Sequence, residues 1–159
     1  MKQMKNSVHL FLALAALVAP VVAFAADTKN DALMEPVKSV LDNYLAIQKE
    51  LTKDSIKAVD QYAAAISKAV KGDDMKMLSP DVAKQADTLA AAKDIKAARE
   101  AFKHLSASLV KYLADNKAGK GTYHEAYCPM AKASWLQTEK EVRNPYYGKS
   151  MLDCGELKN

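Results

Sequence analysis

The chain has 159 residues, of which 50% are hydrophobic and 26% charged, so it is suited to one globular domain with a single core. The formal net charge is +4, and 21 basic residues stand against 19 acidic ones once Lys2 and Lys5 of an expected leader are removed. Such a balance gives no reason to expect a nucleic-acid partner.

The first 25 residues are typical of an export signal that is cleaved off. A basic start precedes an apolar run over residues 10–24, and Ala23 and Ala25 form the small-residue pattern of a cleavage site. The run contains Pro20 and, at about 15 residues, is short for a bilayer crossing of roughly 20. We therefore expect cleavage after Ala25, a periplasmic protein, and no membrane span in the mature chain.

Four amphipathic helices are expected before residue 120. Apolar residues recur at three-to-four spacing over residues 33–52, 56–70 and 95–112, with a weaker alanine-rich stretch over 80–93. Candidate caps are Asp54 and Ser79 at helix starts, with Pro80 at the first helical position, and Gly72 at a helix end. The sequence thus predicts an all-α fold, an up-down four-helix bundle over residues 26–120 within one helical domain, residues 26–159.

From Gly121 onward the helical period disappears and aromatic residues become dense. Four of the seven tyrosines, the single tryptophan and both cysteines lie in residues 121–159. We expect an aromatic, loop-rich tail packed on the bundle, with Trp135, Tyr146 and Tyr147 in its core.

The tail also collects the chain's soft and borderline metal donors, which are His124, Cys128, Met130, Met151 and Cys154. Thiolate and thioether sulfur favour Cu(I), whereas imidazole also accepts Cu(II) and Zn(II). Met151 and Cys154 are three residues apart, so on a helical turn they share one side and can face the Cys128–Pro129–Met130 corner. Paired C-x-x-C units typical of zinc sites are absent.

A disulfide between Cys128 and Cys154 is the competing interpretation, because exported cysteines meet an oxidising compartment. It would close a loop of about 26 residues and contribute about 3 kcal/mol. Oxidation would also remove both thiolates from a Cu(I) site, so the two states exclude each other.

Other donors are better explained by packing or exposure. Met75 and Met77 have an M-x-M spacing but fit ordinary packing, and His104 fits an exposed helix face. No phosphate loop, nucleophile elbow or H-E-x-x-H motif is present, so an enzyme is not expected.

The segments TYHEAYCPMA and WLQTEKEVRNPYYGKSMLDCG, with the weaker REAFKHLSASLVKYL at residues 99–113, resemble a domain family of unknown function. That family occurs at the ends of periplasmic adaptor subunits of Cus-type heavy-metal efflux systems and as free-standing exported proteins. The resemblance implies a helical domain associated with copper or silver handling. Cys128, Met130, Met151 and Cys154 match the family's sulfur residues.

Together these observations predict a periplasmic protein that binds Cu(I), or Ag(I), through the tail sulfurs, with His124 as an optional ligand. It would buffer the ion or deliver it to heavy-metal efflux, with an efflux adaptor or copper chaperone as partner. The alternative is a structural or interaction module of the envelope with a Cys128–Cys154 disulfide and no metal.

Overall fold

The computed structural model describes residues 33–158, so the expected leader, residues 1–25, lies outside the described part of the chain. Four helices are present: α1 (Val37–Thr52), α2 (Val59–Lys71), α3 (Pro80–Ala90) and α4 (Ile95–Asn116). None of the helices within residues 33–158 is long and apolar enough to cross a membrane.

The tail contains a small sheet, so the prediction of an all-α fold with a loop-rich tail is wrong and the fold is mixed α/β. Strands β1 (His124–Cys128), β2 (Ala133–Gln137) and β3 (Glu156–Leu157) form an antiparallel sheet in the order β2-β1-β3, and a 3-10 turn, η1 (Gly148–Ser150), precedes β3. The two longer strands have only five residues each. Apolar and polar residues cannot alternate often enough over five residues to give a recognisable strand pattern, and the nearby prolines indicated turns instead.

The four predicted helices are confirmed, with one correction at the start of α2. Ser79 caps α3 by accepting a hydrogen bond from the Asp81 N–H, and Gly72 ends α2. Asp54, however, is not the N-cap of α2, because its carboxylate binds Arg99 of α4. Helix α2 instead starts at Val59, and Ile56 remains an exposed loop residue.

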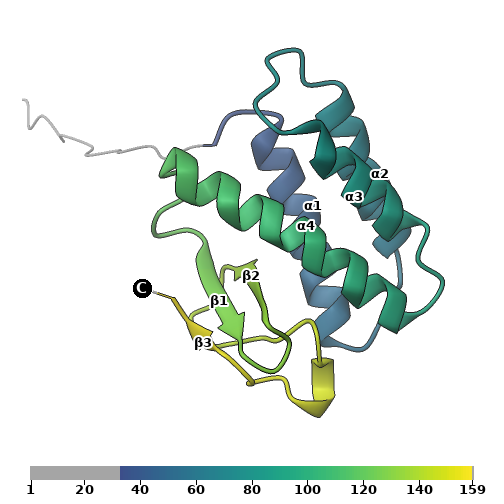
Figure 1. The fold of residues 1–159 in the computed structure, drawn as a ribbon, viewed down its shortest axis with the longest axis vertical. Coiled ribbons are helices and arrows are strands. Elements are labelled where there is room, and N and C mark those ends of the chain that lie inside the picture. The colour runs from purple at the N-terminus through teal and green to yellow at the C-terminus, as the bar shows by residue number, and fades with distance from the viewer. Residues whose placement is uncertain (1–32, 159) are drawn as a thin grey trace, which may run out of the picture.

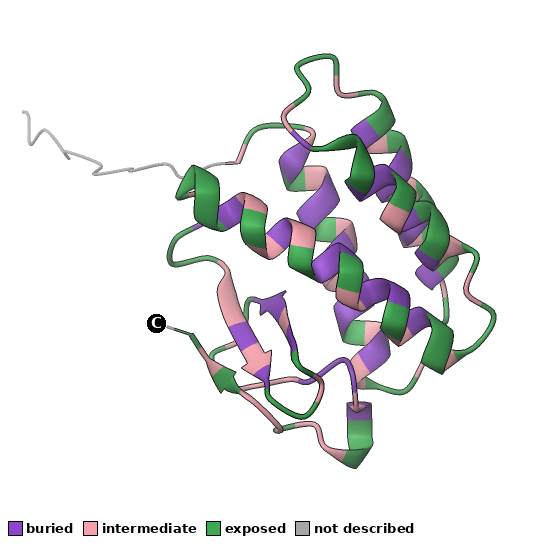
Figure 2. Cartoon of the chain, viewed as in Figure 1, coloured by how far each residue is buried: buried purple, intermediate pink, exposed green. Residues whose placement is uncertain are grey.

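The helices and the sheet form two sides of one core (Figure 1). Helix α2 packs against α1 and α3, α3 packs against α4, and β2 packs against α4 and α1. Strand β2 is buried along most of its length, as Figure 2 shows. Aromatic rings link the two sides, since Tyr44 stacks on Phe102, which contacts Tyr146, which in turn meets Trp135 edge-on.

Two tyrosine hydroxyls bind backbone groups of β2 that do not pair with β1. The Leu136 N–H donates to the Tyr44 hydroxyl at 3.1 Å, and the Tyr146 hydroxyl donates to the Ser134 carbonyl at 2.6 Å. The Tyr44 proton is then available to Ser106 on α4, whose Oγ lies 2.8 Å away. Burial raises the pKa of Tyr44 far above its usual range, which keeps this hydroxyl protonated.

Arg99 fixes the far end of the tail to the helices. Its guanidinium donates to the carbonyls of Leu51 and Pro145 and to the Asp54 carboxylate. Gly148, with φ of 54°, packs so closely here that a Cβ would overlap Asp54 and Arg99. The NPYYG turn, residues 144–148, is therefore held against the end of α1 by the hydrogen bonds of Arg99 and by the close packing of Gly148.

Substitution of Tyr44 by phenylalanine should destabilise the domain by about 1–3 kcal/mol, because the Leu136 N–H and the Ser106 hydroxyl lose a buried partner. The free energy of unfolding from urea titration measures this loss. Tyr62→Phe is the matched control, since Tyr62 is half-buried on α2, which packs against α1 and α3. Equal losses in the two variants would contradict a special role for Tyr44.

Candidate functional site

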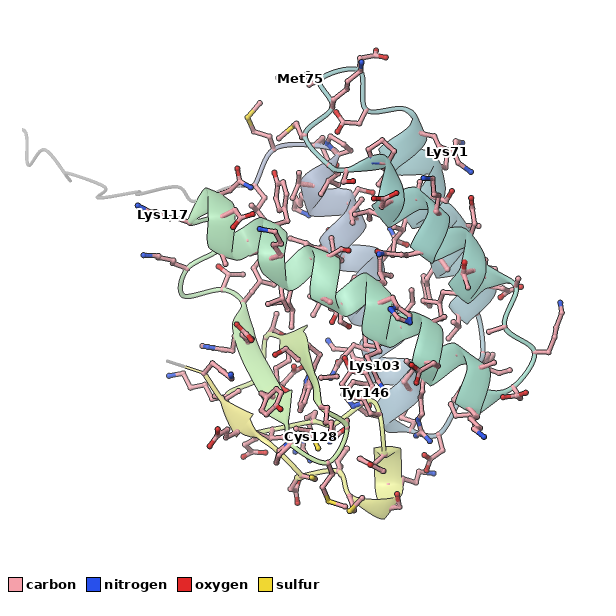
Figure 3. The ribbon with its side chains drawn as sticks, viewed as in Figure 1. Lys71, Met75, Lys103, Lys117, Cys128 and Tyr146 are labelled. Atoms are coloured by element: carbon pink, nitrogen blue, oxygen red, sulfur yellow. The ribbon has the colours of Figure 1, made fainter. Side chains whose placement is uncertain are left out.

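Two cysteines that are 26 residues apart in the sequence meet at one corner of the sheet. Cys128 is the last residue of β1, and Cys154 lies just before β3. Their Sγ atoms are 3.0 Å apart, and both side chains are free thiols rather than a disulfide. Figure 3 labels Cys128 at the lower side of the molecule, away from Met75 at the opposite end.

The turn after Cys128 directs backbone N–H groups at its sulfur. The Cys154 thiol is in hydrogen-bond contact with the Cys128 Sγ at 3.0 Å, and the amides of Met130 and Ala131 and the Asn144 side chain also act on this sulfur to lower its pKa. Hydrogen bonds to the charged form of a group favour that form. The turn that joins β1 to β2 therefore acts as a cradle for a thiolate.

The pKa values of the two thiols are shifted in opposite directions. Burial alone would raise the pKa of Cys128, but the hydrogen bonds to its sulfur outweigh burial and hold that pKa below the usual thiol range. The pKa of Cys154 is raised, mainly because its proton is shared with the Cys128 sulfur and also because of burial and the charge on Cys128. The two shifts favour ionisation of Cys128 before Cys154, so the first thiolate to form in the pair is that of Cys128.

Asn144, which directly precedes Pro145 in the tail, positions the second cysteine. Its buried side-chain amide donates to the Cys154 carbonyl at 2.6 Å, and its side-chain oxygen accepts the N–H groups of Tyr146 and Tyr147. Its own N–H donates to the Leu152 carbonyl at 2.7 Å. One asparagine thus connects the Cys128 sulfur, the NPYYG turn and the segment carrying Cys154.

A second buried amide, Gln137, fills the loop after β2. Its oxygen accepts from the Trp135 indole and the Arg143 N–H, and its NH₂ group donates to the carbonyls of Glu139 and Glu141. All of its hydrogen-bonding capacity toward this loop is used, as a buried polar side chain requires. It fixes the chain that leads from the sheet to Asn144.

Gly155 lets the chain pass directly against β1 after Cys154. Its φ is 134°, and a Cβ at this position would lie 2.7 Å from the Tyr127 carbonyl oxygen and 3.0 Å from the Trp135 ring. Only glycine tolerates both the conformation and the contact. A glycine at position 155 is therefore required to bring Cys154 to Cys128.

The remaining predicted ligands differ in their distance from this pair. Met130 lies in the turn after Cys128 with 60% of its surface exposed, and Met151 starts the turn that the Cys154 N–H closes on the Met151 carbonyl. His124 begins β1, opposite Gln137, and lies four residue steps, about 13 Å, from Cys128 along the strand. The structure brings the two cysteines together and leaves His124 at the other end of the strand.

The other methionines and histidine that the sequence analysis considered lie elsewhere. Met75 is 70% exposed, and Met77 packs partly against the core. His104 is exposed on α4 with its Nε2 4.0 Å from a Glu100 carboxylate oxygen. Within residues 33–158, no three side chains of the His, Cys, Asp and Glu types are grouped so that they could hold a metal ion.

Comparison with known families adds to this picture. A family model described as a protein of unknown function (DUF3347) matches residues 40–121, just over half of the chain. The chain belongs to this family. No curated protein and no solved structure matches. The match covers the helices and includes residues 99–113 of the predicted resemblance, whereas the cysteine-bearing sheet lies beyond it.

Replacing Asn144 by alanine should cost about 2–4 kcal/mol of stability, because several buried backbone groups lose their partner. The same variant should raise the pKa of Cys128, since one donor to its sulfur is removed. Urea unfolding and the ultraviolet absorbance of the thiolate measure the two effects. Asn116→Ala, at the exposed end of α4, should change stability by less than about 0.5 kcal/mol.

Thiolate absorbance against pH should show two steps in the wild type, one below and one above the usual thiol range. Cys154→Ala should raise the pKa of Cys128 by removing a donor, and Cys128→Ala should lower the pKa of Cys154 by removing the acceptor of its proton. If each remaining thiol in the two single-cysteine variants has the same pKa as it has in the wild type, the thiols do not interact.

Proposed function

We propose that this protein binds Cu(I), or Ag(I), through the thiolates of Cys128 and Cys154, with the thioethers of Met130 and Met151 as further donors in the adjoining turns. Its task would be to buffer the ion in the periplasm or to deliver it to heavy-metal efflux. Two soft sulfurs in contact are the observation that carries this proposal, and the lowered pKa of Cys128 supports it.

The available donors favour a monovalent soft ion over zinc. Structural Zn(II) takes four ligands of the Cys, His, Asp or Glu types, and only two such side chains meet at this corner of residues 33–158. Thiolate and thioether ligands select Cu(I) instead. The donor set therefore fits copper or silver in the +1 state.

A metal ion requires the two sulfurs to move apart slightly. With metal–sulfur bonds of about 2.3 Å, two tetrahedrally arranged sulfurs lie about 3.8 Å apart, whereas the two Sγ atoms lie 3.0 Å apart in this structure. Cys154 is only partly buried, so rotation of its side chain supplies this distance while Cys128 stays in its cradle. Binding at neutral pH would release the proton of Cys154.

The cellular setting of the proposal comes from sequence. The leader pattern in residues 1–25 supports export to the periplasm. The tail motifs around Cys128 and Cys154 support an association with Cus-type efflux adaptors or a copper chaperone, because they resemble the domain found there. Export and partner are thus proposed on grounds independent of the cysteine geometry.

Titration of reduced protein with Cu(I) in the presence of a competing chelator tests the proposal. Wild type should bind one ion, and Cys128→Ser or Cys154→Ser should weaken binding by at least about 100-fold, because each removes a metal–thiolate bond. His124→Ala is the control and should leave the affinity unchanged within about threefold, since His124 lies about 13 Å from Cys128.

If the variant lacking both cysteines competes for Cu(I) as well as the wild type does, the proposal is wrong. The tail would then serve as a structural or interaction module. A large loss of Cu(I) affinity in the His124→Ala control would mean that β1 rearranges when metal binds.

A further inference from the structure

The two cysteines differ in their access to solvent. Cys128 is fully buried, whereas Cys154 is partly exposed and touches the Cys128 sulfur. An ion arriving from solvent therefore meets Cys154 before it meets Cys128. The same geometry means that an ion leaving the site breaks its bond to Cys154 first.

We propose that the site is built for exchange: a soft metal ion passes between Cys154 and a partner that carries thiol or thioether ligands, with Met130 as the first and last protein ligand it touches. Cys128 keeps its bond to the ion until the partner's ligand is in place. This inference rests on the proposed binding of Cu(I) or Ag(I) and adds how the ion enters and leaves.

Met130 has the position that such a role requires. It lies two residues after Cys128 in the turn that joins β1 to β2, and its side chain is 60% exposed. Three other large hydrophobic side chains within residues 33–158 are exposed, namely Met34, Ile56 and Met75. Among these four, Met130 alone lies in the turn next to a cysteine of the pair.

The exchange is a ligand substitution in which the ion stays in the +1 state. On entry, the Met130 thioether binds first, then Cys154 binds as it loses its proton to solvent, and Cys128 binds last, while the bonds from the ion to the donor's sulfurs break. On release, an acceptor sulfur binds the ion as the bond to Cys154 breaks and Cys154 takes up a proton, a second acceptor sulfur then displaces Cys128, and the bond to the Met130 thioether breaks last. Two-step exchange of this kind needs an acceptor at the metal before the last protein bond breaks.

Stopped-flow mixing of Cu(I)-loaded protein with excess bicinchoninate, a coloured Cu(I) chelator, tests the inference. The transfer rate should rise with chelator concentration, and Met130→Ala should slow transfer by about tenfold. Met75→Ala is the matched control, because Met75 is similarly exposed at the opposite end of the molecule. Its transfer rate should equal that of the wild type.

Equilibrium titration of the same variants separates the two proposals. If the wild type holds Cu(I) but its transfer rate is independent of chelator concentration, or Met130→Ala transfers as fast as Met75→Ala, the exchange role is overturned and binding stands. If Met130→Ala loses affinity without slowing transfer, Met130 is a static ligand and the exchange role is again wrong. If the wild type holds no Cu(I), both proposals fail.

Discussion

The hydroxyl of Tyr44 is the point at which the helices and the sheet are joined. It receives the N–H of Leu136 on β2 and lies in hydrogen-bond contact with Ser106 on α4, so three elements converge on one buried oxygen. Its ring stacks on Phe102, which continues the aromatic contacts toward Tyr146 and Trp135. The sheet carries Cys128 at the end of its central strand. The position of the thiol pair therefore depends on a contact in the core between the helices and the sheet.

The sequence predicted the helices well because their burial is periodic. The stripe of Val37, Val40, Leu41, Tyr44, Ile47 and Leu51 is the buried face of α1, and the caps at Ser79 and Gly72 are present. The sheet escaped prediction because its strands are short and its stability comes from contacts distant in sequence, such as Tyr44 with Leu136. Propensity and periodicity describe neighbours along the chain and carry no information about such pairs.

The sulfur residues of the candidate site come from the sequence and their role stays a prediction, whereas the groups that support them were missed. The spacing of Cys128, Met130, Met151 and Cys154 identified the sulfurs, and the structure brings the two thiols into contact. Nothing local marked Asn144 as the residue that links Cys154 to the NPYYG turn, because asparagine before proline is an ordinary turn signal. The pKa difference between the thiols was equally invisible, since it comes from Cys154 and the amides of Ala131 and Met130, which reach the Cys128 sulfur only in the folded chain. The disulfide alternative is not the state of this structure.

The hydroxyls of Tyr44 and Tyr146 also protect one edge of the sheet from pairing with another chain. An uncovered strand edge offers a row of N–H and C=O groups that another chain can pair with, which leads to aggregation. On β2 the Leu136 N–H and the Ser134 carbonyl are already occupied by these side chains. The opposite edge of the sheet, β3, is only two residues long. Both edges are therefore poor templates for strand-to-strand association between copies of the domain.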